Sequence, residues 1–120
     1  MKRRSAAAVI AGASAAIMFT ATAAYAHGFD QWFNGSGESP RWDVGAGKHS
    51  GHMTATCPGA QITAQLYRDR PWRPDPPIGS LIVVPCNHQR REFSYDLSGG
   101  KYYFIFRSKV RSNHVWGEFN

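Results

Sequence analysis

The clearest pattern along the chain is an alternation of apolar and polar residues from its middle onward. In QITAQLYR (61–68), Ile62, Ala64 and Leu66 fall on one face, while Thr, Gln and Tyr fall on the other. A period of two is typical of a β-strand with one buried face. MTATC (53–57) comes just before, across a Pro-Gly-Ala segment that suits a turn. The pattern therefore predicts two consecutive strands.

Four further segments have strand character: SLIVVPC (80–86), EFSYDL (92–97), KYYFIF (101–106) and a last segment near 113–119. The second and third alternate cleanly, and Ser-Gly-Gly lies between them, so they are predicted to form a β-hairpin. No stretch after residue 26 has the 3.6-residue repeat of an amphipathic helix. The chain after residue 26 is predicted to be built from strands.

Short strands at a spacing of roughly ten residues are typical of β-sandwiches and small barrels. The predicted fold is all-β: a small antiparallel β-sandwich of residues 52–120, immunoglobulin-like or jelly-roll in outline. A small barrel is the alternative. No internal repeat and no family-specific motif accompanies this pattern.

Residues 27–51 lack this alternation and contain six glycines, so they are predicted to form a Gly-rich arm or long loop. Flexible linkers are normally poor in aromatic residues. This segment nevertheless carries four large ones: Phe29, Trp32, Phe33 and Trp42. Such an arm should lie against a surface, either of its own domain or of another molecule.

The first 26 residues predict a secretory signal peptide. A basic start (Lys2, Arg3, Arg4) precedes an Ala-rich apolar run that ends at Ala24-Tyr25-Ala26, a small-x-small cleavage pattern. A second cleavage site lies at 21–23, and a retained membrane anchor is the alternative. We expect a secreted, extracellular protein with no membrane span after cleavage.

Removal of residues 1–26 would leave 94 residues, enough for one small domain. The three basic residues of the predicted signal account for half of the net charge of +6, which leaves +3. A dedicated nucleic-acid-binding protein needs a denser basic track. Nucleic acid is therefore not expected as a partner.

The chain has two cysteines, Cys57 and Cys86. In an exported protein the default expectation is one disulfide between them. Two free thiols or a metal site are the alternatives, but zinc sites usually contain closely spaced ligand pairs and no C-x-x-C is present.

Cleavage after Ala26 would make His27 the N-terminal residue, with a free amine beside an imidazole. That pair is the copper-chelating arrangement of histidine-brace proteins, including the lytic polysaccharide monooxygenases, and imidazole suits copper. The resemblance is confined to this one residue. We therefore expect no cofactor, with copper at His27 as the alternative. His49 and His52 have a ligand-like spacing, but in a Gly-rich stretch such a pair is usually only solvated.

Catalysis is not expected. Gly35-Ser36-Gly37 is not part of a G-x-S-x-G nucleophile motif between a strand and a helix. Most carboxylates fall in turns or at outward strand positions. Strands in so small a domain leave little volume for an enclosed active site.

Binding is the function that the sequence favours. Residues 69–80 contain four prolines, which predicts a stiff projecting loop. It carries Trp72 between Arg70 and Arg73, and Trp and Arg are enriched at interface hot spots. The alternative is that Trp72 folds back onto the core.

The preferred hypothesis is an adaptor or subunit that docks onto another extracellular protein. Its predicted contact residues are Phe29, Trp32, Phe33, Trp42, Arg70, Trp72 and Arg73. The first alternative is a carbohydrate-binding or cell-wall-binding module that takes a polysaccharide or an anionic cell-wall polymer. The second is a copper protein that uses His27.

Overall fold

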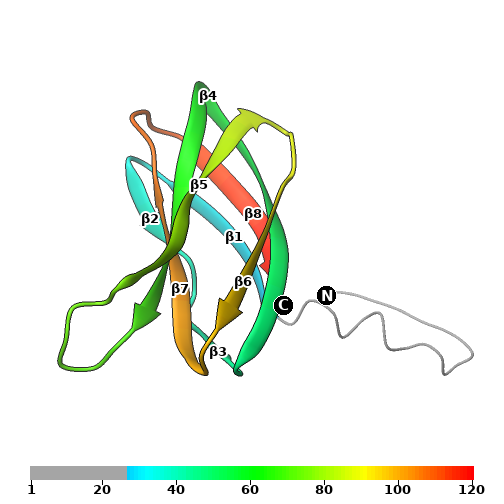
Figure 1. The fold of residues 1–120 in the computed structure, drawn as a ribbon. Coiled ribbons are helices and arrows are strands. Elements are labelled where there is room, and N and C mark those ends of the chain that lie inside the picture. The colour runs from blue at the N-terminus through cyan, green and yellow to red at the C-terminus, as the bar shows by residue number, and fades with distance from the viewer. Residues whose placement is uncertain (1–26) are drawn as a thin grey trace, which may run out of the picture.

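The computed structural model describes residues 27–120, which form eight antiparallel β-strands and no helix (Figure 1). The strands are β1 (His27–Phe33), β2 (Ser36–Glu38), β3 (Trp42–Val44), β4 (Gly47–Asp69), β5 (Pro77–Asn87), β6 (Arg91–Leu97), β7 (Gly100–Arg107) and β8 (Asn113–Phe119). Within this part of the chain no helix could cross a membrane. The predicted signal peptide lies outside the described residues. The all-β antiparallel prediction is confirmed.

The long strand β4 organises the fold. Its first half, residues 47–56, pairs with β6 on one side and with β8 on the other, and β8 also pairs with β1. Its second half pairs with β5 and β7, and β7 continues to β2 and β3. Two layers therefore share β4, and the result is a sandwich that approaches a closed barrel (Figure 1).

The two strands predicted at 53–57 and 61–68 are one strand with an irregularity between them. The pairing of β4 with β5 shifts register between Thr56 and Gln61. Pro58 lies in this interval and has no N–H for a ladder hydrogen bond. The Pro-Gly-Ala segment therefore marks the position of the irregularity correctly. It is a distortion inside β4, however, and not a turn between two strands.

Aromatic rings fill the space between the layers. The Phe93 and Phe104 ring centroids are 5.4 Å apart, and those of Phe29 and Phe106 are 5.7 Å apart. Phe104 has no exposed surface. Each of these pairs joins β6 or β1 of one layer to β7 of the other, so the core holds the layers together.

The prediction of a loop-like arm over residues 27–51 is wrong, because this segment forms β1, β2, β3 and the start of β4. Phe29, Phe33 and Trp42 are only 6–8% exposed and pack in the core. Gln31 lies on the same side of β1 as Phe29 and Phe33, between them. This polar residue interrupts the apolar alternation by which the strand could have been predicted. β2 and β3 have three residues each, too few to display a period.

The predicted hairpin of 92–97 with 101–106 is also wrong, although both strands exist. β6 pairs with the first half of β4, whereas β7 pairs with the second half. Ser98 and Gly99 therefore carry the chain from one layer to the other. The Tyr102 hydroxyl donates a hydrogen bond to the Ser98 carbonyl oxygen, 2.7 Å away, and stabilises this corner.

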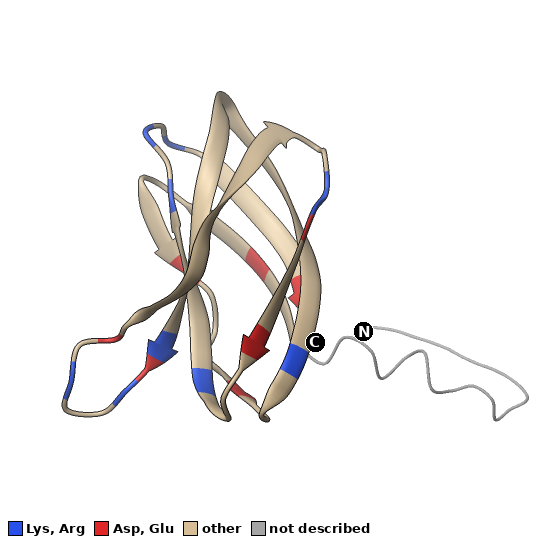
Figure 2. Cartoon of the chain, in the orientation of Figure 1, with Lys and Arg blue, Asp and Glu red and all other residues tan. Residues whose placement is uncertain are grey.

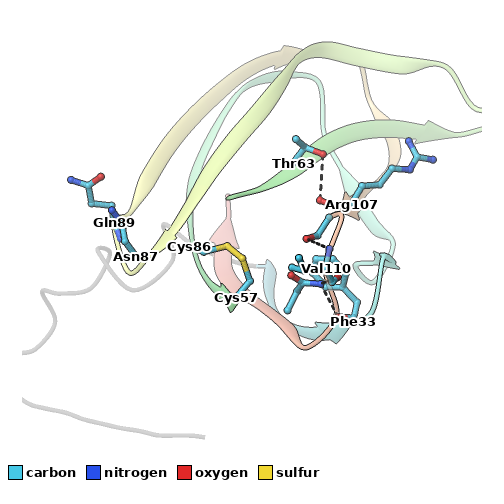
Figure 3. Close-up of a disulfide and its surroundings, with 10 residues drawn as sticks. Phe33, Cys57, Thr63, Cys86, Asn87, Gln89, Arg107 and Val110 are labelled. Carbon is cyan, nitrogen blue, oxygen red and sulfur yellow. Dashed lines mark hydrogen bonds between the residues drawn. A yellow bond between two sulfur atoms is a disulfide. The ribbon is translucent and has the colours of Figure 1, made fainter. Parts of the chain in front are cut away.

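The predicted disulfide between Cys57 and Cys86 is confirmed, with 5.2 Å between the Cα atoms (Figure 3). It joins β4 to the end of β5. This is the stretch in which the β4–β5 ladder is interrupted between Thr56 and Gln61. The covalent link therefore holds the two strands together where backbone pairing does not.

Candidate functional site

The outer face of β1 and β8 carries a row of aromatic rings. Trp32 extends from β1, His114 and Trp116 from β8, and His88 from the turn after β5. We call Trp32, His114 and Trp116 the ring stack. Because alternate residues of a strand point to opposite faces, these side chains lie outside the core that their neighbours fill.

The rings of the stack are in close contact, and the first two lie face against face. Trp32 and His114 have centroids 4.0 Å apart and planes within 6° of parallel. His114 and Trp116 follow at 4.6 Å and 36°. His88 meets the edge of Trp116 at 6.0 Å. Register explains the order, since Trp32 lies directly opposite His114 in the β1–β8 ladder.

Trp32 is held in place and is still open to solvent. One face of its indole packs on His114, yet 70% of the residue is exposed. His114 is itself fixed, because its Nε2 lies 2.6 Å from Oδ1 of Asp30. A carboxylate can only accept, so Nε2 carries the proton. The Asp30–His114 contact therefore supports the Trp32 ring from behind.

A second imidazole and carboxylate lie beyond Trp116. Nε2 of His52 is 3.8 Å from Oε2 of Glu118. An open hollow of about 390 Å³ lies at this end of the face, lined by Gly28, Phe29, Asp30, His52, Trp116, Gly117 and Glu118. Gly28 contributes no side chain to it. The face thus combines exposed aromatic surface with polar groups at both ends.

Of the residues predicted to contact a partner, Trp32 alone belongs to this face. Phe29, Phe33 and Trp42 are core residues, so the interpretation of residues 27–51 as a docking arm does not hold for them. Sequence reasoning missed Asp30, His114 and Trp116. The missing information was the pairing of the first strand with the last, which brings distant residues together.

The predicted loop residues Arg70, Trp72 and Arg73 lie elsewhere, between β4 and β5. Trp72 is fully exposed, so it does not fold back onto the core. We call residues 70–76 the Trp72 loop. Asp75 anchors it, because Oδ1 accepts a hydrogen bond from the Arg70 N–H at 2.9 Å and Oδ2 accepts one from the Tyr103 hydroxyl at 2.5 Å.

These contacts shift two pKa values in opposite directions. The hydrogen bond from Tyr103, and then the one from Arg70, lowers the pKa of Asp75 below its usual 3.8. Burial, reinforced by the bond to Asp75, raises the pKa of Tyr103 to about 12. The ionised carboxylate and the neutral phenol are thus the forms that stabilise the loop.

We predict that the Asp75 anchor survives mild acid. A group whose pKa is lowered in the folded protein stabilises it above the unfolded-state pKa, and this contribution is lost as pH falls through the lower folded value. The Arg70 amide proton reports the bond directly. Its NMR chemical shift should titrate with a midpoint below 3.8. A midpoint at or above that value would show that the anchor is absent in solution.

The structure gives His27 a place at the start of β1, where its ring stacks on Trp42 with 5.7 Å between centroids. Among residues 27–120 no three His, Cys, Asp or Glu side chains are grouped as a metal site. His49 and His52 do not form a pair of ligands. The two ring nitrogens of His49 contact the carbonyl oxygens of Asn120 and Gly45, at 2.6 and 2.7 Å.

No protein-family model matches the chain. No curated protein matches it in sequence either. Similarity is found only at the level of structure.

Two of the solved structures to which the chain is similar are carbohydrate-binding modules. One is a CBM6 carbohydrate-binding module from Cellvibrio mixtus lichenase 5A in complex with cellotriose, 11% identical, with a TM-score of 0.49 over 72% of each chain. The other is the C-terminal CBM6 of LamC, a marine laminarinase from Zobellia galactanivorans. It is 12% identical, and the match covers 82% of this chain and 94% of that one, with a TM-score of 0.51. At such identities the likeness concerns the fold alone, and the fold is a CBM6-like jelly roll.

Proposed function

We propose that the protein is a secreted, non-catalytic carbohydrate-binding module that holds a neutral polysaccharide on the outer face of β1 and β8. The observation that carries this proposal is Trp32, whose indole is fixed on one side and 70% exposed overall. The free face of a fixed aromatic ring is a surface on which the C–H groups of a sugar ring can stack. Little side-chain entropy remains to be lost on binding.

The polar groups around the ring stack favour a neutral ligand. Asp30 and Glu118 are 67% and 49% exposed at their side chains and can accept hydrogen bonds from sugar hydroxyls. Thr54 and Thr56 point to the outer face of β4, because the alternating residues Met53 and Ala55 point into the core. Two carboxylates would repel an acidic polymer at this position. Hydroxyl-rich neutral chains fit better.

The fold supports the same function. LamC is named as a laminarinase, and the domain that resembles this chain is its C-terminal CBM6. β-Glucans are therefore the first ligands to test here. Docking onto another protein through the 27–51 segment has less support, because three of the four aromatic side chains that suggested it are in the core.

The Trp32→Ala variant tests the proposal. We expect it to weaken binding of laminarihexaose or cellohexaose about thirtyfold, or ~2 kcal/mol, which is the loss typical of an aromatic hot spot. Isothermal titration calorimetry measures the effect. Trp72→Ala is the matched control, since it removes an even more exposed indole from the loop between β4 and β5, and it should bind as the wild type does. Unchanged affinity in Trp32→Ala, or loss in Trp72→Ala, would contradict the proposal.

A further inference from the structure

The Trp72 loop projects from the sandwich at the turn between β4 and β5 (Figure 1). Trp72 is 100% exposed and has a φ of 66°. A left-handed conformation is unfavourable for a non-glycine residue, so the surrounding structure must impose it. The fold thus holds a large aromatic side chain in water at some expense of stability.

The loop is fixed from both ends. Asp75 accepts its two hydrogen bonds from Arg70 and Tyr103, and the Arg68 N–H donates to the Pro76 carbonyl oxygen at 3.2 Å. The Arg41 guanidinium lies over the Tyr103 ring, 3.9 Å from its centroid. Prolines restrict the backbone further. The backbone on both sides of Trp72 is therefore anchored to the sandwich.

Basic positions gather along the loop between β4 and β5 and on the nearby start of β7, with acidic positions among them (Figure 2). A hollow of about 460 Å³ between the loop and the start of β7 is lined by Arg68, Asp69, Arg70, Pro71, Arg73, Gly100 and Lys101. Its one carboxylate, Asp69, is engaged by Arg41 at 3.0 Å. Within residues 27–120 the side chains of Arg70 and Arg73 form no hydrogen bond or ion pair. Two guanidinium groups are thus available to a ligand.

We propose that this hollow, with Trp72 at its rim, is a second binding site, and that its ligand is an acidic polysaccharide whose sugar units carry carboxylates. Guanidinium groups bind carboxylates through paired, charge-assisted hydrogen bonds. The indole adds a stacking surface for a sugar ring. This site is separate from the ring stack in both position and charge, and it does not depend on the function proposed for that face.

A membrane surface is the competing partner, since Trp and Arg also suit a bilayer interface. The concave shape favours the polysaccharide. Arg70 and Arg73 line the hollow from the loop, and Lys101, which lies 3.7 Å from Asp43, lines it from β7. A chain with several carboxylates can therefore contact both free guanidinium groups within one concave site. A flat bilayer would meet the tip of the loop, where Trp72 is the one large apolar side chain.

Binding of a galacturonic acid decasaccharide, measured by isothermal titration calorimetry at low salt, tests this site. We expect Arg70→Gln/Arg73→Gln to weaken binding about tenfold or more, since charge-assisted bonds contribute strongly. Trp72→Ala should weaken it about fivefold, a typical aromatic contribution. The Arg70 substitution spares the loop anchor, because Asp75 bonds the backbone N–H and not the side chain.

The matched control is Arg90→Gln/Arg91→Gln, which removes the same charge at the start of β6, where Arg90 lies 3.7 Å from Glu92. Binding in this control should be close to that of the wild type. Trp32→Ala should also retain the acidic ligand, so a failure at the ring stack is distinguishable from a failure here. Equal losses in the two arginine double variants, or no binding by the wild type, would overturn the proposal. So would Trp72-dependent binding to phosphatidylserine vesicles without binding to the decasaccharide.

Discussion

Replacing Phe104 with alanine is expected to lower the free energy of unfolding by about 4 kcal/mol, within the range for large aromatic residues in a core. Phe104 has no exposed surface, and rings from both layers surround it: Phe29, Trp42, Phe93, Phe106 and Phe119. Removing its ring leaves a cavity between the layers that neither can close without losing its own strand pairing.

Urea denaturation of the wild type and the variant measures this effect. Trp72→Ala serves as the control, because a fully exposed side chain should change the free energy of unfolding by less than about 0.5 kcal/mol. A loss below about 2 kcal/mol for Phe104→Ala would mean that Phe104 does not sit at the centre of the core.

The second large effect is expected from the disulfide. Cys57→Ala/Cys86→Ala should lower the free energy of unfolding by about 3.5 kcal/mol, the chain-entropy value for a loop of this length. The cysteines join β4 and β5 across the interval between Thr56 and Gln61 that lacks regular pairing. Their loss should therefore loosen this end of the β5 ladder first.

Denaturation of the wild type with and without reductant provides the comparison. The reduced wild type should match the double variant, because both lack the same link. The total free energy of unfolding of a small domain is often only about 5–15 kcal/mol. The double variant should consequently melt well below the wild type, and equal stability of the oxidised and reduced proteins would contradict the prediction.

The alternation in the second half of the chain predicted individual strands well. Tyr102, Phe104 and Phe106 occupy alternate positions of KYYFIF (101–106), and all three are buried. Alternation does not identify a strand's partner, however. β6 and β7 are adjacent in sequence and are joined by a short connection, yet each pairs with a different half of β4. Their shared partner is long enough to serve both layers, which a local pattern cannot show.

The N-terminal segment was misinterpreted for a physical reason. Glycines and a proline divide it into short strands, and Gln31 interrupts the apolar side of β1. Its aromatic residues were correctly expected to need a surface. For Phe29, Phe33 and Trp42 that surface is their own core.

The candidate site was only partly predictable. Trp32 was singled out because it is aromatic, but its supporting residues lie far along the chain. Asp30 and His114 are separated by 84 positions and meet only because β1 pairs with β8. The Trp72 loop could be predicted better, since its prolines are local in the sequence. The sequence left open whether Trp72 folds back onto the core, and the structure shows it fully exposed.

The most direct test of neutral-carbohydrate binding at the ring stack uses the four tryptophans as reporters: Trp32, Trp42, Trp72 and Trp116. Each indole N–H gives one signal in a proton–nitrogen NMR spectrum, and the signals can be followed while laminarihexaose or cellohexaose is added. We expect the signals of Trp32 and Trp116 to shift in a saturable manner and those of Trp42 and Trp72 to stay in place. A shift at Trp72 without one at Trp32, or no shift with either ligand, would contradict the proposed function.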